Sequence, residues 1–194
     1  MQMQWVCQVC GMPVRRPLTL CPDCRKNLYY FDAQRSCGAY DGNLKHAIVR
    51  MKYYGERWLS RPLGGLLAET AIVFLPVDLV VPVPLGPESR LERGFNQALD
   101  LAVEVSGKIG VPVYDILKRE RGREHQAALG RHLRWSNLQG TMVPKRPEPL
   151  TGKTVLLIDD VTTTGATLDE AARVLKGLGA AKVYCVTLAR TVRR

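Results

Sequence analysis

The strongest local signature of this 194-residue chain is Val155-Leu-Leu-Ile-Asp-Asp-Val-Thr-Thr-Thr-Gly-Ala-Thr167. Residues 155–158 form a continuous apolar run, which is typical of a β-strand covered on both faces. Thr167 and Glu170 match the S/T-x-x-E pattern of a capping box, which predicts that a helix starts there. The threonine-rich turn is therefore expected between a buried strand and a helix N-terminus.

This turn has the chemistry of an anion site. A helix N-terminus offers free N–H groups and the positive end of the helix dipole, which together favour phosphate. Gly165 lets the backbone approach a ligand closely, and the threonine hydroxyls add donors. An ordinary polar turn is the alternative, but such a turn needs neither the preceding carboxylates nor a run of threonines. The predicted phosphate-binding residues are Thr162, Thr163, Thr164, Gly165, Ala166 and Thr167.

Two carboxylates, Asp159 and Asp160, directly follow the predicted strand. They would repel a phosphate, so they need another partner. Ribose hydroxyls, or a Mg²⁺ ion bridging a sugar and a pyrophosphate, satisfy them. Open parallel sheets bind ligands at the carboxyl ends of their strands, which is where both residues are expected.

These residues resemble the phosphoribosyl pyrophosphate (PRPP) signature of type I phosphoribosyltransferases, because Asp159, Asp160 and residues 163–167 match it one for one. The resemblance implies that the acidic pair contacts the ribose hydroxyls and that the turn holds the 5′-phosphate. It also implies Mg²⁺ at the site and a flexible loop over the pyrophosphate. The fold class expected is α/β, with a parallel twisted sheet flanked by helices.

A second loop follows another apolar strand and reads Val81-Pro-Val-Pro-Leu-Gly-Pro-Glu-Ser-Arg-Leu-Glu-Arg-Gly-Phe-Asn-Gln97. A pyrophosphate needs its own cradle of N–H groups and cations at a neighbouring strand end. Its position at the end of an apolar strand favours this function over a surface loop with solvated arginines. The candidates are Pro84, Leu85, Arg90 and Arg93 for the pyrophosphate, and Asn96 or Gln97 for a ribose or base.

The same loop indicates a narrower family within the phosphoribosyltransferase-like proteins. V-P-V-P-L over residues 81–85 and R-x-x-R-G-F-N-Q over residues 90–97 resemble the ComF family of phosphoribosyltransferase-like proteins. Lys52-Tyr-Tyr-Gly55 resembles the K-Y-x-G motif of that family and adds Lys52 to the pyrophosphate candidates. Further matches are Gln126 with Leu129, Arg134 with Asn137 and Gly140, and the closing Leu188-Ala-Arg190. The resemblance covers essentially the whole chain and implies a role in DNA uptake during natural transformation, beside a DNA-translocating helicase.

Four of the six cysteines form two C-x₂-C pairs separated by ten residues: Cys7, Cys10, Cys21 and Cys24. Each pair can chelate one ion from a single turn, and two pairs complete a tetrahedral Zn²⁺ site. Four thiolates leave no open coordination position, so the predicted zinc is structural. Two separate redox C-x-x-C motifs are the alternative.

The formal net charge is +10, and a basic surface concentrates polyanions. A polar, basic segment at residues 118–140 interrupts any periodicity. In this segment the arginines could bind the phosphates of single-stranded DNA and the indole could stack on a base. The candidate residues are Arg121, Arg123, Arg131, Arg134 and Trp135. The alternative, which the sequence favours, is a solvated flap over the PRPP site anchored by Trp135.

The predicted organisation is a zinc-binding module at residues 1–38 and a phosphoribosyltransferase-like domain at residues 39–194. Helices are expected at residues 41–52, 62–74 and 168–178 and in a segment after Gln97 carrying Leu99, Ala102 and Val103; strands are expected at residues 78–81, 112–117, 154–158 and 182–189. No apolar run approaches a membrane span and the first residues do not resemble a secretory signal. A cytoplasmic protein is therefore expected, recruited to the inner face of the membrane by partners.

Three functions remain open at this point. The first is a ComF-type protein that binds PRPP and zinc and handles incoming single-stranded DNA. The second is a working transferase that moves ribose 5-phosphate from PRPP to an acceptor, which needs positioning and charge stabilisation more than a strong base. The third is a regulator that senses PRPP without catalysis.

Overall fold

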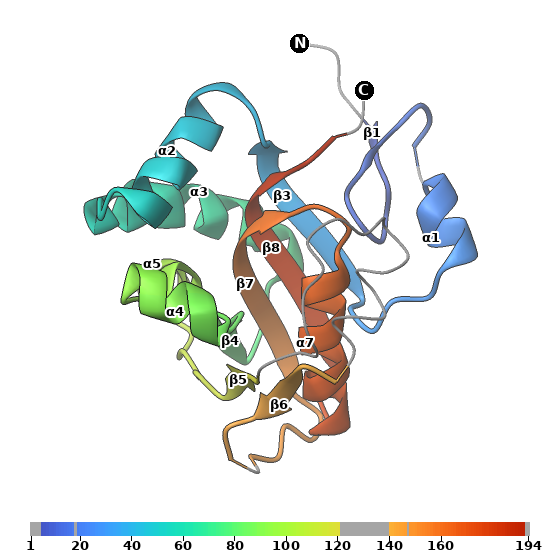
Figure 1. The fold of residues 1–194 in the computed structure, drawn as a ribbon. Helices are drawn as coiled ribbons and strands as arrows, with labels where there is room; N and C mark the ends of the chain where they lie inside the picture. Colours follow the sequence, from blue (N-terminus) through green and yellow to red (C-terminus); the bar gives the residue numbers. More distant parts are fainter. Residues whose placement is uncertain (1–4, 18, 121–139, 147, 193–194) are drawn as a thin grey trace.

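The computed structural model describes residues 5–17, 19–120, 140–146 and 148–192. Its centre is a four-stranded sheet whose strands are all parallel, in the order β3-β8-β7-β4. The strands are β3 (Ala33–Ala39), β8 (Lys182–Arg190), β7 (Thr154–Thr162) and β4 (Leu79–Pro82). Figure 1 shows helices on both sides of this sheet, as the predicted fold class requires.

Alternate residues of β7 point into two separate cores. Val155 and Leu157 belong to the core under α7 (Ala166–Gly177). Leu156 and Ile158 belong to the opposite core, covered by α2 (Gly42–Tyr53), α3 (Ser60–Ala71) and α5 (Gln97–Ile109). All four side chains are fully buried, which explains why this strand is apolar without alternation.

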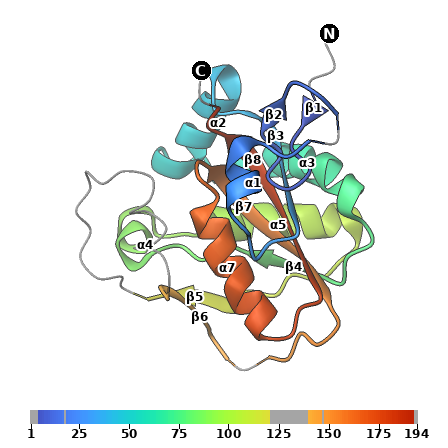
Figure 2. The same cartoon turned by 90° about the vertical axis from the view of Figure 1, so that its right-hand side faces the viewer.

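The cysteine module lies at the N-terminus, where β1 (Trp5–Val6) pairs antiparallel with β2 (Pro13–Val14) and a short helix, α1 (Pro22–Lys26), follows. Figure 2 shows it next to the upper end of α7. Gly11 is required in its turn, because φ is +68° and a Cβ there would lie 2.7 Å from the Gln34 carbonyl oxygen. The Gln34 N–H donates to the Val9 carbonyl (2.7 Å), so the module is joined directly to β3.

Strand β3 was not expected, because its residues fall in a polar stretch assigned to the cysteine module. It crosses the predicted boundary at residue 38 and pairs with β8 in the main sheet. The division into two units stays a proposal, and the structure favours a boundary before Ala33 over one after residue 38.

Most other expected elements are present. The predicted helix at residues 41–52 is α2, and the helix at residues 62–74 is α3, preceded by η1 (Arg57–Leu59) and continued by η2 (Ile72–Phe74). The expected face of α5 is partly wrong, because Val103 is 55% exposed. Within the described parts of the chain, no helix has the length and apolar character to cross a bilayer.

The predicted strand at residues 112–117 is wrong. Only Val113 bridges to Val80, after which the chain leaves the sheet and Leu117–Arg119 (β5) pairs antiparallel with Met142–Pro144 (β6). The apolar run was real, since Ile116 and Leu117 are buried, but they pack in the core beside α7 instead of extending the main sheet. A short helix, α4 (Pro87–Arg93), also lies in the predicted second anion loop.

Candidate ligand site at the carboxyl edge of the sheet

The acidic pair lies inside β7, which continues to Thr162, four residues beyond the predicted end at residue 158. Asp159 is opposite Thr187 and Thr162 is opposite Arg190 in β8. The longer strand was missed because aspartate is rare in strands and was taken as the start of the turn. Both carboxylates therefore have positions fixed by the sheet.

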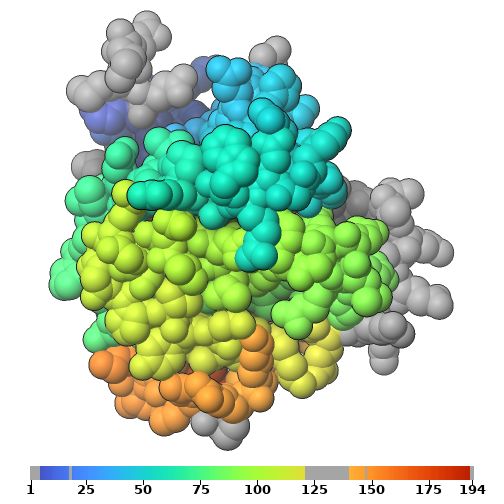
Figure 3. All heavy atoms as spheres, turned by 90° about the vertical axis from the view of Figure 1, so that its left-hand side faces the viewer, coloured from blue at the N-terminus to red at the C-terminus, as the bar shows by residue number. Residues whose placement is uncertain are grey.

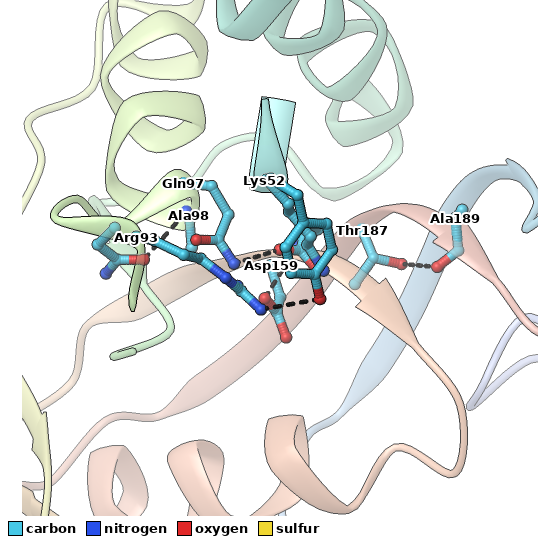
Figure 4. Close-up of polar contacts among 10 residues, drawn as sticks. Lys52, Arg93, Gln97, Ala98, Asp159, Thr187 and Ala189 are labelled. Atoms are coloured by element: carbon cyan, nitrogen blue, oxygen red, sulfur yellow. Dashed lines mark hydrogen bonds and ion pairs between the residues drawn. The ribbon is translucent and has the colours of Figure 1, made fainter. Parts of the chain in front are cut away.

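Asp160 is 4% exposed, and both of its oxygens accept hydrogen bonds. Lys52 Nζ, at the end of α2, lies 2.6 Å from Oδ1, and Gln97 Nε2, at the start of α5, lies 2.7 Å from Oδ2. Figure 4 shows these side chains converging from two helices onto the strand end. Gln97 donates through its NH₂ because a carboxylate only accepts, which leaves its buried Oε1 without a partner among the described residues.

Asp159 is partly exposed, and its Oδ1 accepts the Asp160 N–H at 2.8 Å. The pKa of Asp159 is raised, first because the carboxyl is desolvated and second because Asp160 lies beside it. Lys52 and Arg119 act in the opposite direction. The carboxyl pair is thus flanked by two cations that belong to the chain itself.

The turn after β7 is closed by Gly165, whose φ of +84° favours glycine. Gly165 is the N-cap of α7, and Thr164 Oγ1 accepts the Ala166 N–H at 3.3 Å. The helix therefore begins at Ala166, earlier than predicted, and the expected capping box between Thr167 and Glu170 is wrong. Glu170 instead accepts the Gly140 N–H (2.8 Å), which lies far away in the sequence.

Residues 29–32, which leave the cysteine module, pack against the start of α7. The rings of Tyr29 and Phe31 face Gly165, and the Tyr30 N–H donates to Asp169 Oδ1 at 2.6 Å. Desolvation raises the pKa of Asp169 to about 6, although the Tyr30 and Phe31 N–H groups oppose the shift. No local pattern indicated this support of the turn.

Replacing Glu170 by Gln should destabilise the protein by about 1.5–3 kcal/mol at pH 7, the range for hydrogen bonds to a charged group. Glu170 is 4% exposed and pairs with Arg173 Nε at 2.8 Å. Burial alone would raise its pKa, but Arg173 and the N–H groups of Met142 and Gly140 lower it overall. A lowered folded-state pKa gives stability that is present above the ordinary value of 4.5 and lost as pH falls through the folded value.

Urea unfolding of wild type and Glu170→Gln at pH 7 and pH 3 measures this effect. The difference between them should shrink at pH 3. A difference that stays constant between the two pH values would contradict the assigned charge state.

A small cavity of about 260 Å³ opens just beyond the end of β4, and one of its lining residues, Arg119, interacts electrostatically with Asp159. Its lining combines four predicted residues of the second loop with three cations that sequence reasoning missed: Pro84, Leu85, Arg90 and Asn96, with Lys118, Arg119 and Lys145. The one acidic residue in the lining, Asp115, pairs with Lys145. Burial lowers the pKa of Arg119, and the charges of Asp159 and Glu170 oppose that shift. The cavity is therefore a cationic compartment that adjoins Asp159.

The remaining predicted residues of the second loop lie elsewhere. Arg93 stands over the Tyr53 ring, 4.8 Å from its centroid, and donates to its hydroxyl (Figure 4). Asn96 lines the cavity, but its side chain accepts the Ala98 N–H as the N-cap of α5 and donates to the Val83 carbonyl. Lys52 and Gln97 bind Asp160 and do not line the cavity.

The four N-terminal cysteines are buried and their sulfur atoms all lie within 4.8 Å of one another. Cys10 Sγ and Cys21 Sγ are 3.6 Å apart, too far for a disulfide. A tetrahedral zinc with Zn–S of about 2.3 Å separates its sulfurs by roughly 3.8 Å, so these residues fit that ion. The Arg190 guanidinium, at the end of β8, donates to the Cys10 carbonyl and brings a positive charge beside the thiols.

The predicted nucleic-acid residues Arg121, Arg123, Arg131, Arg134 and Trp135 lie outside the described residues. Both ends of that segment are nevertheless fixed by the same core. The Glu120 N–H donates to the Thr141 carbonyl at 2.9 Å, and Gly140 is held by Glu170. The described residues on its two sides, Glu120 and Gly140, therefore lie close to α7 and to the cavity residue Arg119.

Comparison with known proteins places this site in a family. The Phosphoribosyl transferase domain matches residues 96–194, which contain the acidic pair and the turn. Competence protein F of Haemophilus influenzae is 31% identical, over 95% of this chain and 84% of that protein. The DNA utilization protein YhgH of Escherichia coli is 29% identical (96% and 91%), and Competence protein ComFC of Bacillus subtilis is 28% identical (96% and 78%).

A solved structure of the Bacillus subtilis glutamine PRPP amidotransferase, complexed with ADP and GMP, superposes with a TM-score of 0.49 and 19% identity, over 72% of this chain and 30% of that chain. The relatives match nearly the whole length, including the cysteine module, while the domain match covers the C-terminal half. This chain belongs to the ComF family of competence proteins, and its C-terminal half is a phosphoribosyl transferase domain.

Proposed function

We propose that this chain binds PRPP with Mg²⁺ at the carboxyl edge of its sheet, holds a structural zinc ion in its cysteine module and acts in DNA uptake. The observation that carries the proposal is the juxtaposition of a carboxylate pair, a glycine-closed threonine turn and a cationic cavity at one end of β7. PRPP combines the groups that these parts recognise: ribose hydroxyls, a 5′-phosphate and a pyrophosphate.

Each part of the ligand has a chemical partner in this arrangement. The N–H groups at the start of α7 and the threonine hydroxyls suit the 5′-phosphate. Asp159 suits a ribose hydroxyl, since its second oxygen accepts no hydrogen bond from the described residues. Arg90, Lys118 and Arg119 suit the pyrophosphate, because cations in a partly buried cavity bind phosphate strongly.

Two metal ions belong to this proposal. Mg²⁺ would arrive with the pyrophosphate, with Asp159 as the carboxylate of the acidic pair that interacts electrostatically with the cavity residue Arg119, and would neutralise charge on the leaving group. Zinc would take the four buried thiols and leave no open position, which fits a structural function. The chain's own residues then hold the ligand in place and exclude water from its buried side.

Transfer of ribose 5-phosphate to an acceptor is the second candidate. The observation in its favour is that Arg119 lies between the acidic pair and the cavity, where charge develops as pyrophosphate leaves. Measuring pyrophosphate release from PRPP with a panel of nitrogen acceptors tests it. Release above the rate without protein would show a transferase, and binding without release would leave a PRPP-sensing protein.

Competition separates the two halves of the ligand site. Ribose 5-phosphate should bind through the turn and Asp159, pyrophosphate should bind in the cavity, and PRPP should displace both. Calorimetric titrations of each compound in the presence of Mg²⁺ measure these affinities. If pyrophosphate binds but PRPP does not displace it, the cavity is not part of a PRPP site.

The role in DNA uptake draws on relatives that are named competence and DNA utilization proteins. One feature of the described surface agrees with contact to single-stranded DNA. Three aromatic side chains between the end of α2 and η1 are 62–72% exposed: Tyr53, Tyr54 and Trp58. The Arg93 guanidinium lies over the ring of one of them, Tyr53, and the Arg57 guanidinium lies over the ring of Phe95. Figure 3 shows this face, where the cyan end of α2 meets the green segments of α4 and α5.

Replacing Trp58 by Ala should weaken binding of a single-stranded oligonucleotide roughly tenfold, within the range for losing one base stacked on an aromatic ring. Ile72→Ala is the matched control, because Ile72 is 61% exposed and apolar but has no aromatic ring on which a base could stack. Fluorescence anisotropy at several salt concentrations measures both. Equal affinities for the two variants, or an affinity no better than that of an unrelated basic protein at matched salt, would remove this surface from the proposal.

A further inference from the structure

Asp160 is not available to a ligand in the way that Asp159 is. Its two oxygens accept Lys52 Nζ at 2.6 Å and Gln97 Nε2 at 2.7 Å, and the residue is 4% exposed. Each oxygen keeps a second lone pair, but because the residue is almost fully buried, a ribose hydroxyl has no open approach to it unless the ammonium or the amide moves aside. Either displacement leaves a buried donor unsatisfied, which is costly.

Asp159 differs from its neighbour in each respect. It is partly exposed, and only its Oδ1 is engaged, by the Asp160 N–H at 2.8 Å. Arg119, which lines the cationic cavity, is close enough to influence its ionisation. Asp159 therefore has an oxygen that accepts no hydrogen bond from the described residues, and it interacts electrostatically with a cation of the cavity.

Lys52 and Gln97 reach Asp160 from different elements. Lys52 lies in the last turn of α2 and Gln97 is the first residue of α5, so the carboxylate joins two helices to the end of β7. Lys52 is also partly buried, with its side chain 14% exposed. A lysine in this position supplies a fixed positive charge next to two carboxylates, a charge that a metal ion would otherwise have to supply.

We infer that the two aspartates of the PRPP motif have different tasks: Asp159 binds the ligand, whereas Asp160, neutralised by Lys52 and held by Gln97, is a positioning residue that does not contact it. The inference rests on the proposed PRPP function and divides the work within that site. Lys52 then cancels about one of the negative charges that the carboxyl pair would otherwise present to an anionic ligand. Mg²⁺ without PRPP should accordingly not bind to the pair.

Affinity for PRPP with Mg²⁺, measured by calorimetry, tests the division. Asp159→Asn should lower the affinity about 10- to 100-fold, the loss of a hydrogen bond to a charged group. Asp160→Asn should bind at least as tightly as wild type, because no ligand contact is removed and one negative charge near an anionic ligand is lost. Lys52→Met should lower the affinity for PRPP roughly tenfold, because it leaves an uncompensated negative charge about 10 Å or less from an anionic ligand.

The double variant Lys52→Met with Asp160→Asn is the decisive arm. It removes both charges at nearly constant shape, so it should recover an affinity close to that of wild type. A purely structural role of Lys52 predicts no such recovery of binding, and a ribose contact by Asp160 predicts a further loss. The double variant also decides the matter if Asp160→Asn alone does not fold.

The outcomes separate the two levels of the proposal. If the wild type does not bind PRPP, or if Asp159→Asn binds it as well as wild type does, the proposed function fails. If wild type binds PRPP and Asp159→Asn does not, the PRPP site is supported. If Asp160→Asn or the folded double variant then loses as much affinity as Asp159→Asn, the division of tasks between the two aspartates is overturned. Saturable binding of Mg²⁺ alone to the wild type would also count against the division of tasks.

Discussion

Removing the metal from the cysteine module, by a chelator or by Cys21→Ser with Cys24→Ser, should lower the melting temperature by roughly 8–16 °C, which corresponds to about 4 kcal/mol in a chain of this size. Structural zinc contributes on the order of 10 kcal/mol in isolated zinc-finger peptides, so this value is a modest share of it. The module has almost no apolar core apart from the four cysteines themselves. Without an ion, no ligand bond links the four buried thiols, and the module loses its main stabilising interaction.

The loss should extend beyond the module. Its turn is bonded to β3 through Gln34 and to β8 through Arg190, and residues 29–32 support the start of α7. Calorimetric melting together with zinc analysis of the purified protein measures the effect. Cys37→Ser is the control, because Cys37 lies outside the cluster and should retain both zinc and stability. Protein without zinc that melts at the temperature of the loaded form would contradict a structural metal.

Lys52→Met should lower the free energy of unfolding by about 3–5 kcal/mol, since it leaves the buried Asp160 carboxylate without its cation. Lys52→Met with Asp160→Asn should recover most of that loss, because no charge is then left unpaired. Arg50→Met on the same helix is the matched control. Arg50 pairs with Glu56 at 2.8 Å, but its side chain is 59% exposed, so its loss should cost less than about 1 kcal/mol.

Urea unfolding at pH 7 compares these variants. The account of the ion pair is wrong if Lys52→Met and Arg50→Met are equally stable, or if the double variant is no more stable than Lys52→Met.

The local sequence was sufficient to predict the strand, the turn and the helix around the PRPP motif. The apolar run at residues 155–158 is buried on both faces, and the glycine at position 165 has the positive φ that a tight turn needs. Hydrophobic periodicity and turn-forming residues act over a few positions, so both can be recognised directly in the sequence. The two cysteine pairs could also be predicted from the local sequence, because the C-x₂-C spacing brings the two thiols of each pair together.

The partners of the site residues could not be predicted in this way. Lys52 is 108 positions from Asp160, and the Tyr30 N–H is 139 positions from Asp169. Only the packing of α2 and of residues 29–32 against the sheet brings them together. The cations Lys118 and Arg119 were likewise seen only as part of a basic segment, because their position depends on the pairing of β5 with β6.

Two local patterns were misleading for a physical reason. Glu170 satisfies the capping-box pattern, yet two backbone N–H groups of residues 140 and 142 and the Arg173 guanidinium take its carboxylate. Asn96 has the chemistry of a ligand contact but caps α5. In both cases a backbone N–H group takes the side-chain oxygen: for Glu170 the donors lie about 30 positions away and sequence spacing does not reveal them, whereas for Asn96 the donor is the nearby Ala98 N–H.

Calorimetric titration of the zinc-loaded protein with PRPP and Mg²⁺, in wild type, Arg119→Met and Lys153→Met, tests the central claim most directly. Arg119 lines the cationic cavity, whereas Lys153 is an exposed cation just before the opposite, amino end of β7, so both variants change the charge equally. The account predicts saturable, Mg²⁺-dependent binding that Arg119→Met weakens roughly tenfold or more and Lys153→Met leaves unchanged. Absence of binding by the wild type, or equal weakening in the two variants, would contradict a PRPP site at the carboxyl edge of this sheet.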